Sequence, residues 1–417
     1  MKPRHLAGAL GAALKDTPAV FLQGPRQAGK STLAQAAAAH GRRTPPGYLT
    51  LDDAAVLAAA EADPDGFVDG LAGPVVLDEV QRAPGIFRAL KRSVDADRRP
   101  GRFLLTGSAQ ALVLPRVSES LAGRMEVLTL WPFSQGELEG RREGFVDACF
   151  AKEFRPGAYR DAGWPALAER IVRGGFPEAA ARTDAARRQA WFGSYVTTIL
   201  ERDVRDLANV AGLRDLPRLL RLAAARTMGL LNFADLSRDA AMPQTTLQRY
   251  WALFEATFLV RTLPPWTANP TLRLVKTPKV LPVDTGLCCH LLGLDADRLL
   301  ADDLMAGPLL EAFVAGELLK QAGWSRVRAA LHHYRTHAQQ EVDLVLEDPA
   351  GRLVGLEVKK SASPTAHDFR GLRHLAEQTG RRFLRGILLH TGTSSAAFGP
   401  NLVAAPVSSL WRLETNG

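Results

Sequence analysis

Gly24-Pro-Arg-Gln-Ala-Gly-Lys-Ser31 fits the pattern G-x-x-x-x-G-K-[ST], which is typical of a phosphate-binding P-loop. The apolar run at 18–22 predicts a buried strand before it, and the Ala-rich segment at 31–40 predicts a helix after it. This order directs backbone N–H groups and the positive helix end at one point, where a triphosphate binds. The expected ATP-binding residues are Gly24, Pro25, Arg26, Gln27, Ala28, Gly29, Lys30, Ser31 and Thr32.

The apolar run Val75-Val-Leu77, followed by Asp78 and Glu79, supplies the second element of this site. A continuous apolar run is typical of a parallel strand that is buried on both faces. Asp78 would hold the Mg²⁺ shell together with Ser31, and Glu79 would orient or deprotonate the attacking water. Lys30 would meet the β- and γ-phosphates. An Asp-Glu pair is common by chance. This interpretation therefore depends on the position of the pair after a P-loop in the same chain.

A third expected strand, 102–109, ends in small polar residues. Thr106 and Ser108 would sense the γ-phosphate or position water at the carboxyl edge of the sheet. The alternative is an ordinary turn at the end of a strand, and spacing alone does not decide between the two.

The composition favours a soluble protein. Two or three domains are expected, because 417 residues are too many for one core. No apolar run approaches the roughly 20 residues of a membrane span. The first residues lack the apolar segment of a signal peptide, so we expect no membrane association and a cytoplasmic location. The three cysteines have neither a disulfide nor a zinc spacing. A net charge of +8 favours a polyanionic partner.

Several motifs together resemble one widespread bacterial and archaeal family, whose members join an AAA+ ATPase core to a C-terminal domain of unknown function that looks like a PD-(D/E)XK nuclease. Beside the P-loop, these motifs are Val76-Leu-Asp-Glu-Val-Gln81, Leu105-Thr-Gly-Ser108, Leu121-Ala-Gly-Arg-Met125, Trp131-Pro-Phe-Ser-Gln-Gly-Glu137, Gly174-Gly-Phe-Pro-Glu178, Pro282-Val-Asp-Thr-Gly286 and Glu341-Val-Asp-Leu344. The resemblance implies an α/β fold with a P-loop AAA+ parallel sheet core. It makes Thr106 and Ser108 sensor candidates and Arg124 a candidate arginine finger, in its own subunit or in a neighbour's. Action across a subunit boundary would require a homo-oligomer.

The middle of the chain predicts a winged helix. An amphipathic helix at 216–226 precedes a second helix at 233–239 capped by Asn232, a third at 242–256 and a strand at 258–263. The outward-facing, nucleic-acid-binding candidates on the third helix are Gln244, Thr245, Gln248 and Arg249. Few Lys or Arg residues lie on this helix, so a domain that only packs against others is the alternative.

The last third predicts strands within 272–284, a helix at 308–320 and strands at 327–335, 341–347 and 353–360. Asp343 and Glu357 would lie on neighbouring strands of a hairpin and converge on a cation, with Lys359 beside them and Glu311 contributed by the helix. This order looks like the PD-(D/E)XK pattern. Ordinary Glu/Lys alternation on an exposed strand is the alternative.

We therefore expect an ATPase core at 1–205, a winged-helix domain at 206–270 and a restriction-endonuclease-like α/β domain at 271–417. ATP and Mg²⁺ are the expected cofactors, and nucleic acid, DNA in the first place, is the expected partner. One rival is a signalling switch in which nucleotide exchange controls partner binding. Another is a passive DNA tether whose nuclease-like domain does not cut.

Overall fold

The computed structural model describes residues 2–39, 47–71, 73–110, 123–159, 163–204, 215–336 and 338–413. The chain forms two compact units, Met1–Phe133 with Ala256–Phe258, and Ser134–Glu255 with Leu259–Gly417. We call these the N-terminal and the C-terminal unit. Among the described helices, none combines the length and the apolar character that a bilayer crossing requires.

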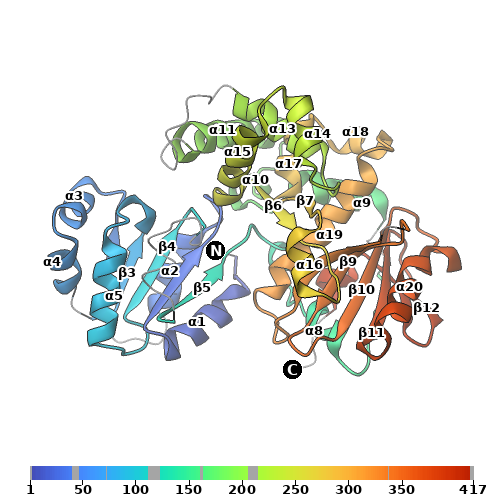
Figure 1. Cartoon of the computed structure of the whole chain (residues 1–417), viewed down its shortest axis with the longest axis horizontal. Coiled ribbons are helices and arrows are strands. Elements are labelled where there is room, and N and C mark those ends of the chain that lie inside the picture. The colour runs from blue at the N-terminus through green and yellow to red at the C-terminus, as the bar shows by residue number, and fades with distance from the viewer. Residues whose placement is uncertain are drawn as a thin grey trace. The chain divides into compact units, whose positions relative to one another are not determined.

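A five-stranded parallel sheet forms the centre of the N-terminal unit, with strand order β2-β3-β4-β1-β5 (Figure 1). Its strands are β1 (Ala19–Gln23), β2 (Gly47–Thr50), β3 (Val75–Asp78), β4 (Phe103–Gly107) and β5 (Met125–Thr129). Strands β1, β3 and β4 lie where the apolar runs predict strands. Since all five strands are parallel, the P-loop after β1 and the acidic pair at the end of β3 lie at the same edge of the sheet.

Helices cover both faces of this sheet. They are α1 (Leu6–Asp16), α2 (Lys30–Ala39), α3 (Ala54–Ala62), α4 (Pro64–Asp69) and α5 (Ile86–Ala96). Val20 and Leu22 of β1 pack in a core with α1 and α2, whereas Ala19 and Phe21 pack in a second core with α3, α4 and α5. This alternation places the continuous apolar run of β1 between two buried layers, as expected for a parallel sheet.

The C-terminal unit begins with a helical segment. Its elements are α7 (Gln135–Glu139), α8 (Phe145–Phe150), α9 (Trp164–Arg173), α10 (Pro177–Ala180), α11 (Ala185–Thr198) and the π-helical η3 (Ile199–Asp203). Ile171 shares a core with Phe313, and Phe192 shares another with Leu219. These contacts join the segment to the rest of the unit, so the two compact units part after Phe133 and not near residue 205.

Three helices and a small sheet follow. They are α13 (Leu216–Ala225), α14 (Phe233–Ala240), α15 (Gln244–Ala256), β6 (Val260–Leu263), α16 (Pro270–Val275) and β7 (Lys279–Pro282). Strands β6 and β7 are antiparallel, and bridges from Thr227 to Val280 and from Leu230 to Lys279 add a short third edge. Asn232 caps α14 by accepting hydrogen bonds from the N–H groups of Ala234 and Asp235, so the predicted cap is confirmed.

One predicted element of this region is wrong. The apolar pattern predicts strands within 272–284, but 270–275 form the helix α16 and only Lys279–Pro282 form a strand. The Asn269 side chain accepts a hydrogen bond from the N–H of Thr271, and Pro270 occupies the first turn. An Asn-Pro start is a strong helix signal, and here it prevails over the apolar pattern.

The last part of the chain forms a six-stranded mixed sheet with strand order β12-β13-β11-β10-β9-β8 (Figure 1). Its elements are α17 (Thr285–Leu292), α18 (Ala296–Ala301), α19 (Ala306–Ala322), β8 (Ala330–Arg335), β9 (Glu341–Glu347), β10 (Leu353–Lys359), η5 (Ala366–Phe369), α20 (Arg370–Thr379), η6 (Gly380–Arg382), β11 (Phe383–His390), β12 (Ala396–Gly399), β13 (Leu402–Pro406) and α21 (Ser409–Arg412). Strands β8, β9 and β10 form an antiparallel meander, and β11 runs parallel to β10. Helix α19 packs in one apolar core of the sheet and α20 in the other.

Two of the sequence motifs interlock within the C-terminal unit. Asp284 is buried and accepts hydrogen bonds from the N–H groups of Gly175, at 2.7 Å, and Leu287, at 2.9 Å. A Cβ on Gly286 would lie 2.8 Å from the Gly174 nitrogen, so the backbones approach too closely for a side chain. Burial raises the pKa of Asp284 above its ordinary value. These motif residues therefore hold the fold together.

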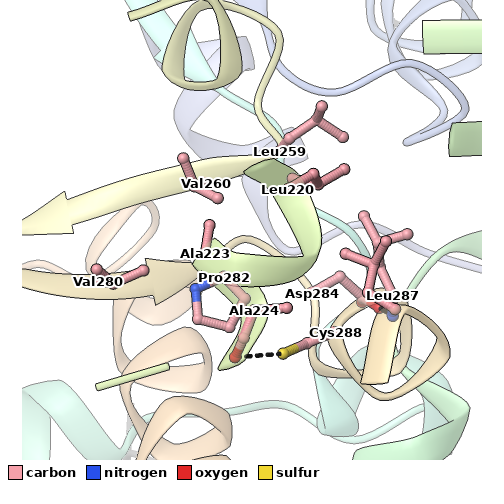
Figure 2. Close-up of a pocket in the computed structure, with 11 residues that line it drawn as sticks. Leu220, Ala223, Ala224, Leu259, Val260, Val280, Pro282, Asp284, Leu287 and Cys288 are labelled. Carbon is pink, nitrogen blue, oxygen red and sulfur yellow. Dashed lines mark hydrogen bonds between the residues drawn. The ribbon is translucent and has the colours of Figure 1, made fainter. Parts of the chain in front are cut away.

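A small cavity of about 10 Å³ lies between α13, β6, β7 and α17 (Figure 2). Its walls are apolar except for Asp284 and Cys288, whose thiol lies 3.8 Å from the Ala224 carbonyl oxygen. This volume is about that of one water molecule, so the cavity is too small to bind an organic ligand.

Candidate functional site

The P-loop adopts a backbone that depends on glycine at two positions. Gly24 has φ 151°, and a Cβ there would lie 2.2 Å from the Leu130 carbonyl oxygen. Gly29 has φ 92°, in the region that L-residues avoid. The Lys30 ammonium is buried and donates to the carbonyl oxygens of Gly24 and Pro25, at 3.0 Å each. The loop thus places this cation at the N-terminus of α2, where phosphate binds.

The other predicted ATP-binding residues lie along the same loop. Pro25 and Ala28 are buried, Arg26 is half-buried, and Gln27 and Thr32 are exposed. Gln27 has φ 61°, so a non-glycine residue is in the left-handed region beside the phosphate-binding turn.

Arg4, which lies outside the motif, holds the P-loop in place through hydrogen bonds. Its guanidinium donates to the carbonyl oxygens of Ala28, at 2.7 Å, and Trp131, at 2.6 Å. The same group lies 4.6 Å from the centre of the Phe133 ring. This buried arginine fixes the loop to the segment that follows β5.

Three hydroxyl groups surround the Asp78 carboxylate. Ser31 lies 3.0 and 2.9 Å from its two oxygens, Tyr48 donates to Oδ2 at 2.7 Å, and Thr106 donates to Oδ1. Burial, followed by the bond to Asp78, raises the pKa of Tyr48 to about 12, so the phenol remains a donor at neutral pH. The structure therefore brings Ser31, Asp78 and Thr106 together as the motifs predict.

Glu79 lies next to this carboxylate but points to a different set of partners. Its backbone is left-handed, with φ 58° and ψ 44°, which is uncommon for a non-glycine residue. Its carboxylate accepts hydrogen bonds from the Ser108 hydroxyl, at 3.1 Å, and from the Gln81 amide. Gln81 also donates to Ser108 at 2.9 Å. Such a backbone persists only where its surroundings impose it, and these cases cluster at functional sites.

The donor set at the P-loop fits Mg²⁺, which takes hard oxygen ligands and is bound through few protein groups and the nucleotide phosphates. Ser31 and Asp78 present a hydroxyl and a carboxylate to each other at the carboxyl edge of the sheet. When bound there, the metal would neutralise charge on the phosphates.

Arg124 is not at this edge. It precedes β5, whose first residue, Met125, is in register with Ala19 at the start of β1. The P-loop follows the other end of β1, roughly 13 Å farther along the strand. The guanidinium instead forms an ion pair with Asp95 at 2.6 Å. Arg124 therefore does not reach the P-loop of its own chain, and only the action in a neighbouring subunit remains a prediction.

The four nucleic-acid-binding candidates lie on one exposed side of α15. Gln244, Thr245, Gln248 and Arg249 are all exposed. Leu247 and Phe254 on the same helix are fully buried in the core of this region. The predicted orientation of this helix is confirmed, while binding to nucleic acid stays a prediction.

The predicted carboxylate pair of the last domain, Asp343 and Glu357, also lies close together. The last pair of the ladder between β9 and β10 is Leu344 with Leu356. Asp343 and Glu357 are the next residues on the two antiparallel strands. Beyond the ladder, the Asp343 carboxylate accepts from the N–H of Val358, at 2.9 Å, and Glu357 accepts from the N–H of Asp343, at 3.3 Å. Both side chains therefore satisfy backbone groups that the ladder leaves without partners.

Lys279 of β7 joins this cluster. Its ammonium lies 2.7 Å from Glu311 Oε1 and 2.8 Å from Glu341 Oε1. Burial and the charge of Asp343 raise the pKa of Glu311 to about 8 and also raise the pKa of Glu357. Burial opposes the charge on Lys279 and Lys359, but the neighbouring carboxylates raise both pKa values.

These residues do not fit a divalent metal in the arrangement observed. Asp343 and Glu357 are engaged with backbone N–H groups, and Glu311 is engaged with Lys279. In the described part of the chain, no three acidic, histidine or cysteine side chains are arranged to hold a metal ion. The predicted cation site at Asp343 and Glu357 therefore lacks structural support.

Sequence reasoning missed four residues that the structure brings to these sites: Arg4, Tyr48, Gln81 and Lys279. Gln81 had a usable signal, because it lies two residues after Glu79 in the same motif. The other three contact their sites only through strand order or through contacts between distant segments.

Comparison with known proteins identifies relatives along most of the chain. A model described as an AAA domain matches residues 16–139, and models described as domains of unknown function, DUF8612 and DUF4143, match 165–298 and 306–410. Uncharacterized protein Rv2008c of Mycobacterium tuberculosis is 35% identical over 363 residues, which are 87% of this chain and 75% of that protein. Uncharacterized protein Mb2031c of Mycobacterium bovis matches with the same identity and coverage.

Two solved structures show weaker similarity. The Walker-type ATPase paby2304 of Pyrococcus abyssi has a TM-score of 0.43 at 15% identity, over 70% of this chain and 96% of that one. AMPPCP-bound DnaA from Aquifex aeolicus has a TM-score of 0.27 at 16% identity, over 59% of this chain and 84% of that one. With the P-loop geometry and the match at 16–139, the mycobacterial relatives decide the assignment: the chain belongs to the family of these proteins and carries an AAA-type P-loop ATPase domain.

Proposed function

We propose that the protein is a Mg²⁺-dependent ATPase that couples ATP hydrolysis to the binding or remodelling of nucleic acid. Its hydrolytic site is the edge of the parallel sheet that carries Lys30, Ser31, Asp78 and Glu79. The observation that carries the proposal is the pairing of Ser31 with Asp78 beside a separately held Glu79. One carboxylate is thus available to the metal shell and the other to the attacking water.

Support for a nucleic-acid partner comes from the middle of the C-terminal unit. The elements follow one another as in a helix-turn-helix with a wing. In chain order they are α13, the segment whose residues Thr227 and Leu230 are bridged to β7, α14, α15, β6 and β7. The side of α15 that remains exposed carries amide, hydroxyl and guanidinium groups, which bond to phosphates and base edges. The net charge of +8 favours a polyanion in general.

An ATPase assay with single-stranded, duplex and branched DNA, and with RNA, tests this function. We expect turnover to rise several-fold with at least one of these polymers, and the rise to shrink as salt increases because counterions are released on binding. Lys30→Ala protein measured in parallel shows how much turnover belongs to the P-loop. An ATPase rate that none of these polymers changes at low salt would contradict the coupling of hydrolysis to nucleic acid.

A second candidate function is a nucleotide-controlled switch whose C-terminal domain is catalytically inactive. The contact of Lys279 with Glu311 and Glu341 favours it, because these carboxylates are engaged by a side chain of the protein itself. A switch would hydrolyse ATP slowly, and its rate would respond to a protein partner but not to DNA or RNA. The same assay therefore separates the two functions.

A further inference from the structure

The acidic cluster of the C-terminal sheet has a cation supplied by the chain itself. Four carboxylates are electrostatically coupled where β9, β10 and α19 meet: Glu311, Glu341, Asp343 and Glu357. The buried ammonium of Lys279 lies 2.7 and 2.8 Å from two of them. These are the distances of direct charge-assisted hydrogen bonds, so the ammonium occupies a position between α19 and β9.

Lys279 is fixed in this position by its strand. It belongs to β7, where it pairs with Leu263 of β6 and is bridged to Leu230 on the other side. Only 3% of its side chain is exposed. The ladder fixes the backbone of Lys279, and burial together with the two ion pairs holds its ammonium in the cluster.

The two remaining carboxylates are also engaged. Asp343 and Glu357 accept hydrogen bonds from backbone N–H groups beyond the end of the β9–β10 ladder. A divalent metal would need oxygen atoms from several of these carboxylates at about 2.0–2.6 Å. It would have to displace the Lys279 ammonium from Glu311 and Glu341.

We propose that Lys279 is a built-in counter-ion that takes the place of a divalent cation in the C-terminal carboxylate cluster. The domain then folds and acts without a metal, and the chemistry of metal-dependent strand cleavage is not available to it. This inference rests on the second candidate function, whose inactive C-terminal domain it explains. Its consequence is that removal of the ammonium leaves buried carboxylates that attract a divalent cation.

The test compares Lys279→Met with Lys276→Met, a matched change in the same segment at a half-buried lysine. All proteins are full-length, nucleotide-free and treated with chelator, and all carry Asp78→Asn, which removes the P-loop carboxylate as another metal site. Thermal unfolding and calorimetric titration with Mn²⁺ are then measured. Neither readout involves nucleic acid or ATP turnover, so failure here is distinguishable from failure of the proposed function.

We expect the parent and Lys276→Met to show no saturable Mn²⁺ binding and no metal-dependent change in Tm. Lys279→Met should unfold at a temperature lower by roughly 5 °C or more in chelator, because a buried charge group has lost its partner. Mn²⁺ should bind this variant and restore most of the loss. Saturable Mn²⁺ binding by the parent that Asp343→Asn abolishes would overturn the proposal.

A double variant covers the case in which Lys279→Met does not fold. Adding Glu311→Gln removes one of the two carboxylates that contact the ammonium, so the double variant should regain stability without metal. If it is no more stable than the single variant, Lys279 acts through the packing of its side-chain stem and not through its charge, and the proposal is wrong.

Discussion

The Tyr48 hydroxyl donates a hydrogen bond of 2.7 Å to Oδ2 of Asp78, so a residue of β2 orients the carboxylate at the end of the neighbouring strand β3. Ser31 and Thr106 contact the same carboxylate. When the Ser31 hydroxyl turns toward a metal, the Tyr48 and Thr106 bonds remain available to hold Asp78. This arrangement gives Tyr48 a positioning role at the nucleotide site.

Tyr48→Phe tests this role with little change in shape. The Mg²⁺ concentration for half-maximal ATPase activity should rise about three- to tenfold, the cost of one hydrogen bond to a charged group at a partly exposed site. ATP binding without metal should not change, because Tyr48 contacts the carboxylate and not the P-loop. Tyr159→Phe, in the other compact unit, is the control. An unchanged Mg²⁺ requirement would leave Tyr48 as a packing residue.

Glu79→Gln should separate binding from hydrolysis. The variant keeps a side chain that can bond to Ser108 but loses the charge that activates water, so turnover should fall about 100-fold or more. Binding of a fluorescent ATP analogue should stay near the parental value, whereas Lys30→Ala should lose it because the phosphates lose their cation. Glu61→Gln, at an exposed position on α3, controls for the loss of one acidic charge. Parental turnover in Glu79→Gln would remove this carboxylate from the mechanism.

The sequence predicts the nucleotide site because its parts are local. The P-loop and the acidic pair each lie directly after a predicted strand, and parallel strands bring their carboxyl ends to one edge. Tyr48 was missed because its contact depends on the adjacency of β2 and β3, which spacing does not reveal. Lys279 was missed for a similar reason, since its partners Glu311 and Glu341 lie far along the chain.

Arg124 shows how one missed element changes an interpretation. The motif that contains it ends at Met125, and the strand that begins there was not predicted. Once Met125–Thr129 is a parallel strand, the residue before it must lie at the amino edge of the sheet. The distance from the P-loop follows from strand direction alone.

Mixing experiments test whether Arg124 completes the site of a neighbouring subunit. Arg124→Ala alone should lose most turnover, as removal of an arginine finger does, by roughly 1000-fold. Random mixing with Lys30→Ala protein should restore about a quarter of parental turnover, since half of the subunits keep Lys30 and half of their neighbours keep Arg124.

Asp95→Asn is the matched control for this experiment. It breaks the ion pair with Arg124 but leaves the guanidinium in place. If Asp95→Asn and Arg124→Ala lose the same activity, the ion pair only stabilises the domain. A monomer that turns over normally after Arg124→Ala would also contradict the prediction.

Arg249→Glu tests nucleic-acid binding by α15. We expect affinity for the preferred polymer to fall about tenfold and the slope of log K against log salt to decrease by about one, because one phosphate contact is lost. Fluorescence anisotropy at several salt concentrations measures both. Arg381→Glu makes the same charge change at an exposed residue before β11. Equal losses in the two variants would show that only net charge matters and that α15 is not the contact surface.

His333 should make the C-terminal unit sensitive to mild acid. It is fully buried on β8, and burial, followed by the charge of Lys279, lowers the pKa of His333 to about 4 from the ordinary 6.5. Since the folded-state pKa lies below the unfolded value, the neutral ring stabilises the fold fully above pH 6.5, and this contribution is lost as pH falls toward 4. Between pH 7 and pH 5 the loss amounts to about 2 kcal/mol.

Urea unfolding at pH 7 and pH 5 measures this loss in the parent and in His333→Gln. The glutamine amide can still donate to the Thr277 carbonyl oxygen, which lies 3.3 Å from His333 Nε2, but it does not titrate. The variant should therefore lose about 2 kcal/mol less than the parent over this interval. His367→Gln, at an exposed position in η5, should behave like the parent. If His333→Gln weakens as much as the parent on acidification, another group titrates in this window and His333 stays neutral for reasons unconnected with stability.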